Sequence, residues 1–262
     1  MNKRFLKKFK TGFVVFFLLF TGCTNTGQQK YSATNVEQAW IEASVYLPDS
    51  SLPKKLSSVK LEQPFPVVVY LHGCTGITSH DSAWAKYISK LGFIVVLPNS
   101  MARQWRESNC DGRLAKITNK FPLAHVYRQQ EIELAWNRLQ SYNWVMKDKI
   151  FLMGHSEGGV AVATTTSDKY KGQIISGWGC TDKKYSSFNG IKSPKHIPVL
   201  AIADRNDFWH KGTIWQGQCS DQADSRLDFT QIDMKAGGEH STYQYSEARM
   251  AVSSFLKRLT VD

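Results

Sequence analysis

A serine flanked by glycines stands near the middle of this 262-residue chain. Gly154, Ser156 and Gly158 have the spacing G-x-S-x-G; the apolar run 149–154 leads into them, and small residues follow up to position 166. A strand, a tight turn and a helix in that order would expose the serine at the strand end, where it can attack a carbonyl carbon. The glycines are needed because the strained turn brings backbones too close for Cβ atoms. We interpret Ser156 as a nucleophile.

A serine hydroxyl needs a general base and an orienting acid, which in this type of site follow in the chain order Ser, Asp, His. His240 lies in the glycine-rich stretch AGGEHST, before the last helical pattern. We expect it to take the serine proton and return it to the leaving group. Asp207, beyond the end of an expected strand, is the first choice for the acid. Asp204 is the second choice, because its position suits a turn.

Acyl transfer also needs donors for the negative oxygen of the tetrahedral intermediate, and backbone amides serve this purpose. The first expected donor is the N–H of Glu157, directly after the serine. The second is the N–H of Cys74, in the turn LHGCTG that follows the expected strand 65–72. The sequence therefore predicts an oxyanion hole formed by Cys74 and Glu157.

Short apolar runs alternate with helical patterns along the chain, which predicts an α/β fold with a mostly parallel, doubly wound sheet of about eight strands and helices on both faces. The expected strands cover residues 65–72, 92–98, 149–154, 173–178, 198–204 and 228–234. The expected helices cover residues 82–92, 122–141 and 241–259. Two more alternating stretches, 39–48 and 56–62, are expected to add antiparallel edge strands. One domain over 37–262 accounts for all of these elements.

The first residues have the pattern of an export signal. Five basic residues precede the apolar run 13–20, which is too short to span a membrane and is followed by small residues. The stretch LFTGC resembles the lipobox of bacterial lipoproteins, which implies removal of residues 1–22 and lipidation of Cys23. Residues 23–36 would then form a polar tether. We expect an exported, membrane-anchored protein, in the outer membrane where the cell has one, because Thr24 follows the cysteine.

Charge and cysteine content bear on nucleic-acid binding, metal binding and disulfide formation. Without residues 1–22 the chain keeps 28 basic and 22 acidic residues, a formal charge of +6, and it contains no nucleic-acid-binding motif. No C-x-x-C or H-x-x-x-H spacing predicts a metal site, and no organic cofactor is implied. Four cysteines remain after Cys23, and an oxidising compartment favours two disulfides, for which three pairings exist.

Four segments together resemble the dienelactone hydrolase branch of the α/β-hydrolases: YLHGCTG at 70–76, GHSEGG at 154–159, ADRND at 203–207 and GGEH at 237–240. This resemblance spans residues 60 to 260. It implies an α/β-hydrolase fold, a triad of Ser156, Asp207 and His240, and Cys74 as an oxyanion donor. The enzymes that gave the family its name use a cysteine nucleophile, so the serine here favours the broader serine esterases of the same fold.

Members with a segment like 97–112 tend to carry a cysteine facing the one in HGC, which implies the disulfide Cys74–Cys110. The expected strand order agrees with this pairing and leaves Cys180–Cys219 as the second. Four tryptophans fall in loops at the catalytic edge, where they either line an apolar pocket or pack under long loops. These are Trp105, Trp178, Trp209 and Trp215.

The favoured function is hydrolysis of small to medium carboxylic esters through a Ser-His-Asp acyl-enzyme mechanism, with a small-molecule ester as partner. One alternative is a serine peptidase of the same fold, which would cleave peptide amides. The other is a non-catalytic, surface-binding lipoprotein on a hydrolase scaffold. The sequence does not determine the oligomeric state or the natural substrate.

Overall fold

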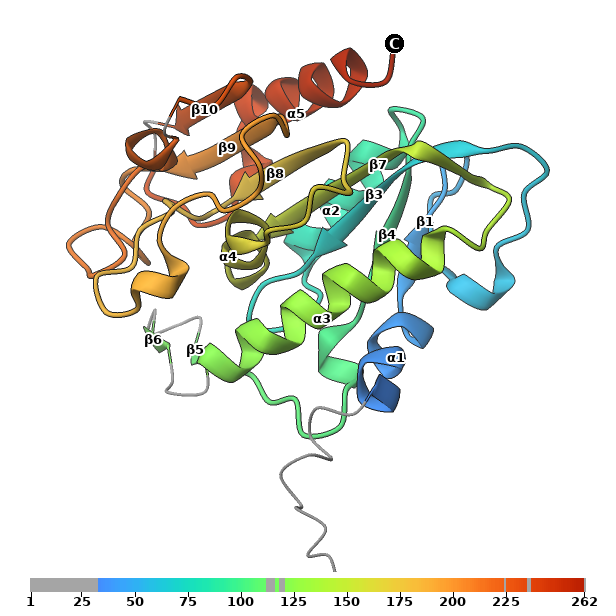
Figure 1. Cartoon of the computed structure of the whole chain (residues 1–262), viewed down its shortest axis with the longest axis horizontal. Helices are drawn as coiled ribbons and strands as arrows, with labels where there is room; N and C mark the ends of the chain where they lie inside the picture. Colours follow the sequence, from blue (N-terminus) through green and yellow to red (C-terminus); the bar gives the residue numbers. More distant parts are fainter. Residues whose placement is uncertain (1–32, 112–115, 118–120, 224, 235–236, 262) are drawn as a thin grey trace, which may run out of the picture.

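The structure is a computed structural model that describes residues 33–111, 116–117, 121–223, 225–234 and 237–261 (Figure 1). The expected signal segment 1–22, the lipidation site Cys23 and residues 24–32 of the expected tether lie outside these ranges. In the part of the chain that is described, no helix has the length and apolarity that a membrane span requires.

An eight-stranded sheet forms the centre of the fold, in the order β10-β9-β8-β7-β3-β4-β1-β2. The strands are β1 (Ser44–Tyr46), β2 (Lys54–Lys55), β3 (Phe65–Leu71), β4 (Ile94–Leu97), β7 (Val145–His155), β8 (Gly172–Ser176), β9 (Val199–Asp204) and β10 (Phe229–Met234). The six strands from β10 to β4 are parallel, and β1 and β2 extend one edge in antiparallel pairing. This confirms the predicted mostly parallel α/β sheet.

Helices cover both faces of the sheet (Figure 1). The helices are α1 (Ala33–Ile41), α2 (Ser79–Ser89), α3 (Phe121–Leu139), α4 (Glu157–Thr164) and α5 (Ser246–Arg258). Side chains of α1, α3 and α4 share one apolar core with one face of the sheet, and those of α2 and α5 share a second core with the other face. The central strands are buried on both sides, which explains their uninterrupted apolar sequences.

The N-terminal predictions were wrong in three places, although β1 confirms an antiparallel edge strand within 39–48. Residues 39–41 belong to helix α1 rather than to a strand over 39–48, because Val36, Ala39 and Trp40 bury one face of a helical turn. The predicted strand 56–62 is replaced by β2 and a short 3-10 turn at Leu56–Ser58. Helix α1 also includes residues 33–36, which the sequence assigned to the tether, and Asn35 and Val36 are buried.

Both predicted disulfides are present. Cys74 pairs with Cys110, at the start of a small antiparallel sheet of β5 (Cys110–Asp111) and β6 (Lys116–Ile117). Cys180 pairs with Cys219, so the loop after β8 is tied to the loop after β9. Both bridges lie among the loops that follow the parallel strands, at the edge of the sheet where the candidate site residues are found.

Candidate active site

The turn at Ser156 has the geometry of a nucleophile elbow. Strand β7 ends at His155, α4 begins at Glu157, and Ser156 between them has φ 55° and ψ −117°. A non-glycine residue with positive φ is strained and persists only where its surroundings hold it. Here the N–H of Ser156 donates to the carbonyl of Ser176 on β8 (2.9 Å), and the Ser156 carbonyl accepts from Val160 (2.9 Å).

The glycines on either side of the serine are explained by close backbone contacts. A Cβ on Gly158 would lie 2.2 Å from the carbonyl oxygen of Leu71, at the end of β3. A Cβ on Gly154 would lie 2.2 Å from the carbonyl oxygen of Gly158. Neither neighbour is a flexible side chain, so β3, β7 and α4 meet at the elbow only where side chains are absent.

His240 and Asp207 are joined by a hydrogen bond, with Nδ1 and Oδ2 2.6 Å apart. The other ring nitrogen, Nε2, is buried and has no hydrogen-bond partner among the described residues. Ser156 and His240 line the same two cavities. The structure thus brings the three residues of the predicted triad to one place, with one imidazole nitrogen bound to Asp207 and the other without a partner among the described residues.

Asp207 receives further donors besides His240. The N–H of Trp209 donates to Oδ1 (2.9 Å), and Nδ1 of His210 lies 3.3 Å from Oδ2. Burial alone would raise the pKa of this carboxyl, but the hydrogen bond and charge of His240 lower it below its usual value. Asp207 is therefore an ionised carboxylate at neutral pH.

Asp204, the second choice for the acid, makes a different set of contacts. Its Oδ1 accepts from the N–H of Asn206 (2.8 Å), and its Oδ2 accepts from the N–H of Gly238 and the hydroxyl of Tyr245 (both 3.0 Å). Because Gly238 lies two residues before His240, these bonds hold the loop that carries the imidazole. This carboxylate braces the site and does not contact the ring.

Three more histidines surround His240. The ring of His155 lies 4.8 Å from that of His240 and 4.1 Å from that of His80, while the ring of His210 is 5.5 Å from His240 (centroid distances). Burial lowers the pKa of His80 to about 3, that of His210 to about 4, and that of His155 well below its usual value. These three rings are neutral at neutral pH.

Glu157, the residue after the serine, has a buried carboxylate with three strong partners. Its Oε1 accepts from Arg128 Nε (2.7 Å) and Arg106 Nη2 (2.6 Å), and its Oε2 accepts from Asn109 (2.6 Å). Burial would raise the pKa of this carboxyl, but Arg128 and Arg106 lower it below its usual value. Asn109 directly precedes Cys110, so this contact also connects Glu157 to the disulfide between Cys110 and Cys74.

Arg128 reaches the predicted oxyanion loop as well. Its Nη2 donates to the carbonyl oxygens of His72 (2.7 Å) and Gly73 (3.3 Å), directly before Cys74. Its Nη1 pairs with Glu131 (3.1 Å), which in turn accepts from Arg103 (3.3 Å). All of these charged side chains are buried. They hold together the loop after β3, helix α3 and the start of α4.

Two cavities meet at Ser156. The tryptophan cavity is small, about 20 Å³, and apolar. Its walls include Phe121, Val160, Trp178, Trp209 and Trp215. The histidine cavity, about 200 Å³, is lined by the rings of His80, His155 and Trp209 and by several small polar residues. Neither has a lysine or arginine in its described lining.

Three of the four predicted tryptophans thus line the tryptophan cavity, and one of them, Trp209, also borders the histidine cavity. Trp105 lines neither and is about half exposed. Its backbone has positive φ (62°) in the loop after β4. The interpretation of Trp105 as a pocket residue is therefore wrong.

One group of described residues has the composition of a metal site: Asp207, His210 and His240, whose ligand atoms lie within 4.8 Å of one another. The hydrogen bond between His240 and Asp207 already uses two of these atoms. A metal ion bound there would replace the contact that orients the imidazole, so the arrangement suits proton transfer.

The buried ion pairs and the neighbouring histidines were not predicted from the sequence. A signal for the ion pairs existed on α3, where Ala124, Arg128, Glu131 and Ala135 have the spacing of one helix face and all are buried. Two opposite charges on an apolar face indicate a buried pair. The histidines gave no such signal, because they come from α2, β7 and the loop after β9 and meet only in the folded chain.

The chain matches one known protein family. The sequence model of the dienelactone hydrolase family matches residues 56–213, which include Cys74, Ser156 and Asp207 but end before His240. Comparison with curated proteins gives no match.

Solved structures share the fold at low sequence identity. Est1E from Butyrivibrio proteoclasticus is 12% identical with a TM-score of 0.56, over 84% of this chain and 94% of that one. The dienelactone hydrolase-like promiscuous phosphotriesterase P91 from metagenomic libraries is 14% identical with a TM-score of 0.57, over 83% and 97%. An S-formylglutathione hydrolase from Agrobacterium tumefaciens is 15% identical with a TM-score of 0.56, over 83% and 89%.

Proposed function

Because this chain belongs to the dienelactone hydrolase family, we propose that it is a serine esterase that cleaves uncharged carboxylic esters with Ser156, His240 and Asp207. The observation that carries the proposal is the short bond from His240 to Asp207, with Nε2 left unpartnered beside the cavities that Ser156 lines. This is the arrangement in which an imidazole accepts a serine proton.

The reaction follows from these positions. Ser156 Oγ attacks the ester carbonyl carbon while His240 Nε2 takes its proton, and the N–H groups of Cys74 and Glu157 bind the resulting oxyanion. As the intermediate collapses, the alcohol leaves with the proton from His240. Water, deprotonated by His240, then cleaves the acyl-enzyme, which releases the carboxylic acid and restores Ser156. Asp207 keeps Nδ1 protonated and stabilises the imidazolium in both steps.

The cavities support a short, uncharged acyl group. The tryptophan cavity has room for little more than a methyl group, since a single water molecule needs roughly 10–15 Å³. Arg106 and Arg128 are buried in ion pairs with Glu157, and neither lines a cavity at Ser156, so their charges are not offered to a substrate carboxylate. A dienelactone carries such a carboxylate, so a neutral ester suits this site better.

We also propose that the body is exported and anchored through Cys23. The two disulfides support an oxidising compartment, because such bonds are rare where thiols are kept reduced. Labelling of the expressed protein with a radioactive fatty acid tests the anchor. Label should appear on the wild type and be absent from Cys23→Ala; label on both would refute lipidation at this cysteine.

Hydrolysis of p-nitrophenyl esters tests the esterase, with residues 24–262 as the enzyme. Acetate should be the best substrate and octanoate the poorest. Ser156→Ala and His240→Ala should each lower kcat by about 10⁴-fold or more, and Asp207→Asn by about 10³- to 10⁴-fold. Asp228→Asn, whose carboxylate pairs with Arg258 at the surface, is the matched control and should keep most of the activity. Full activity in Ser156→Ala would refute the nucleophile.

A further inference from the structure

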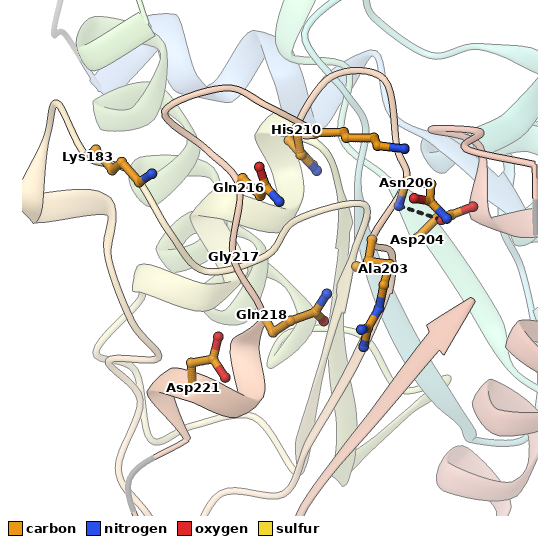
Figure 2. Close-up of a pocket in the computed structure, with 11 residues that line it drawn as sticks. Lys183, Ala203, Asp204, Asn206, His210, Gln216, Gly217, Gln218 and Asp221 are labelled. Atoms are coloured by element: carbon orange, nitrogen blue, oxygen red, sulfur yellow. Dashed lines mark hydrogen bonds between the residues drawn. The ribbon is translucent and has the colours of Figure 1, made fainter. Parts of the chain in front are cut away.

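A third cavity, the polar cavity, lies next to the proposed site and takes no part in the mechanism (Figure 2). Its volume is about 460 Å³, larger than that of either cavity at Ser156. It opens among the loops after β8 and β9, at the edge of the sheet where parallel α/β folds bind ligands. His210 lines both this cavity and the tryptophan cavity, so the two are neighbours.

The floor of the polar cavity is held in place by close contacts. A Cβ on Gly179 would lie 2.2 Å from the carbonyl oxygen of Gly217, and a Cβ on Gly217 would lie 2.0 Å from Thr181 Oγ1. The disulfide Cys180–Cys219 joins the same two loops one and two residues away. A surface formed before binding loses little conformational entropy when a ligand arrives.

Several side chains around this floor carry hydrogen-bond donors that are not used by other described residues. Gln216 and Gln218 each accept a bond through Oε1, from Gly212 and Gln231, which leaves both amide N–H₂ groups as donors. The ammonium groups of Lys183 and Lys211 form no hydrogen bond or ion pair within the described part of the chain. Figure 2 shows Lys183, Gln218 and Asp221 around the hollow below His210.

The charges in the lining are close to balance. Arg205 is paired with Asp233, and Asp204 is used by the loop that carries His240. The carboxylates of Asp204 and Asp221 offset much of the charge of the two lysines and disfavour a strongly anionic ligand. A ligand with several hydroxyl groups and no charge matches amide and ammonium donors beside a carboxylate acceptor.

We propose that the polar cavity binds the carbohydrate part of the substrate, so that the enzyme cleaves an ester formed on a sugar hydroxyl. The sugar lies beyond His210, and its short acyl group reaches Ser156 and the tryptophan cavity. This inference rests on the esterase function proposed above, which the following experiment tests separately.

The experiment compares three acetates: p-nitrophenyl acetate, cyclohexyl acetate and a monoacetylated methyl cellobioside. The wild type should cleave the sugar ester with a higher kcat/KM than cyclohexyl acetate. Lys183→Ala and Gln218→Ala should each raise KM for the sugar ester about 3- to 10-fold, the effect of one lost hydrogen bond. Both should leave kcat/KM for p-nitrophenyl acetate within about twofold. Lys60→Ala, in a cavity formed by residues 59–62 and 142–144, is the matched control.

The esterase function and the carbohydrate site would fail with different experimental results. Cleavage of p-nitrophenyl acetate with no preference for the sugar ester, or with no effect of the two variants, would overturn the carbohydrate site and leave the esterase. If no ester is cleaved, the esterase fails, and calorimetry with unacetylated methyl cellobioside decides on the cavity. Saturable binding that is weakened by Lys183→Ala would support the carbohydrate site. No binding would overturn the proposal of that site.

Discussion

Arg128 donates a hydrogen bond to the carboxylate of Glu157 over 2.7 Å, and the same guanidinium donates to the carbonyl oxygen of His72. The two loops that it joins carry the two proposed oxyanion donors, the N–H groups of Glu157 and Cys74. One buried side chain thus ties together two loops whose proposed donors are 83 residues apart in the chain.

Replacement of Arg128 by lysine should therefore affect the chemical step. A lysine has one nitrogen and cannot donate in the fixed directions of a guanidinium, so the donors shift relative to each other. We expect kcat on p-nitrophenyl acetate to fall about 10- to 100-fold, with little change in KM. Steady-state kinetics, together with thermal unfolding of the same sample, measures this.

Arg138→Lys is the control, because it lies on the same helix and its ion pair with Glu37 is partly exposed. It should change the free energy of unfolding by less than about 1 kcal/mol and leave kcat unchanged. If Arg128→Lys lowers stability while kcat of the folded protein is unchanged, Arg128 does not position the donors.

Gly158→Ala should prevent the elbow from forming. The new Cβ would lie 2.2 Å from the carbonyl oxygen of Leu71, and a backbone atom cannot move away without shifting β3. We expect loss of esterase activity and either a large fall in the melting temperature or insoluble protein. Gly212→Ala is the control, since nothing lies within 4 Å of its Cβ and only its positive φ (74°) is strained. Equal effects of the two variants would contradict the steric explanation.

Stability should fall as the pH is lowered from about 6.5 to 4. Burial lowers the pKa of five histidines in the folded state, to about 3 for His80, to about 4 for His125 and His210, and well below the usual value for the other two. They are His72, His80, His125, His155 and His210. The unfolded chain binds protons at these residues below pH 6.5 and the folded chain does not, so their contribution is complete above that pH and is lost below it.

Each of these histidines adds a slope of up to about 1.4 kcal/mol per pH unit within that window. Urea unfolding at pH 7.5, 6.0 and 5.0 measures the total. His125→Gln, which removes a ring in contact with Thr164 outside the proposed triad, should make the slope shallower. Equal free energies of unfolding at pH 7.5 and 5.0 would contradict the neutral histidine cluster.

The two disulfides should differ in their effect on activity. Each closes a loop of similar length, so removal of either should cost about 2–4 kcal/mol. Replacement of Cys74 and Cys110 by serine should also lower kcat, because Cys110 follows Asn109, which holds Glu157. Replacement of Cys180 and Cys219 should spare p-nitrophenyl acetate. Equal losses of kcat in the two double variants would argue against this division.

The sequence was sufficient to predict the placement of residues that depends on local order. The glycine spacing at Ser156, the loop position of His240 and the alternation of strands and helices all follow from neighbours in the chain. Asp207 and Asp204 could be ranked because one lies at a strand end and the other beyond it. The structure gives Asp207 the contact with His240 and Asp204 a bracing role.

The contacts that depend on distant segments could not be predicted in the same way. Arg106 reaches Glu157 across 51 positions, and His80 packs on His155 across 75, with no pattern in the sequence that links them. The antiparallel edge strands were expected, but their bounds were wrong, because alternation over a few residues does not distinguish an edge strand from a helical turn.

The start of α4 carries the partial positive charge that aligned peptide dipoles produce at a helix N-terminus. A free carboxylate on its first residue, Glu157, would offset that charge at the point where the proposed oxyanion would form. Arg106 and Arg128 both pair with this carboxylate, away from solvent. In the proposed reaction, the partial charge of the helix can therefore act on the oxyanion while the first residue still anchors the helix to the core.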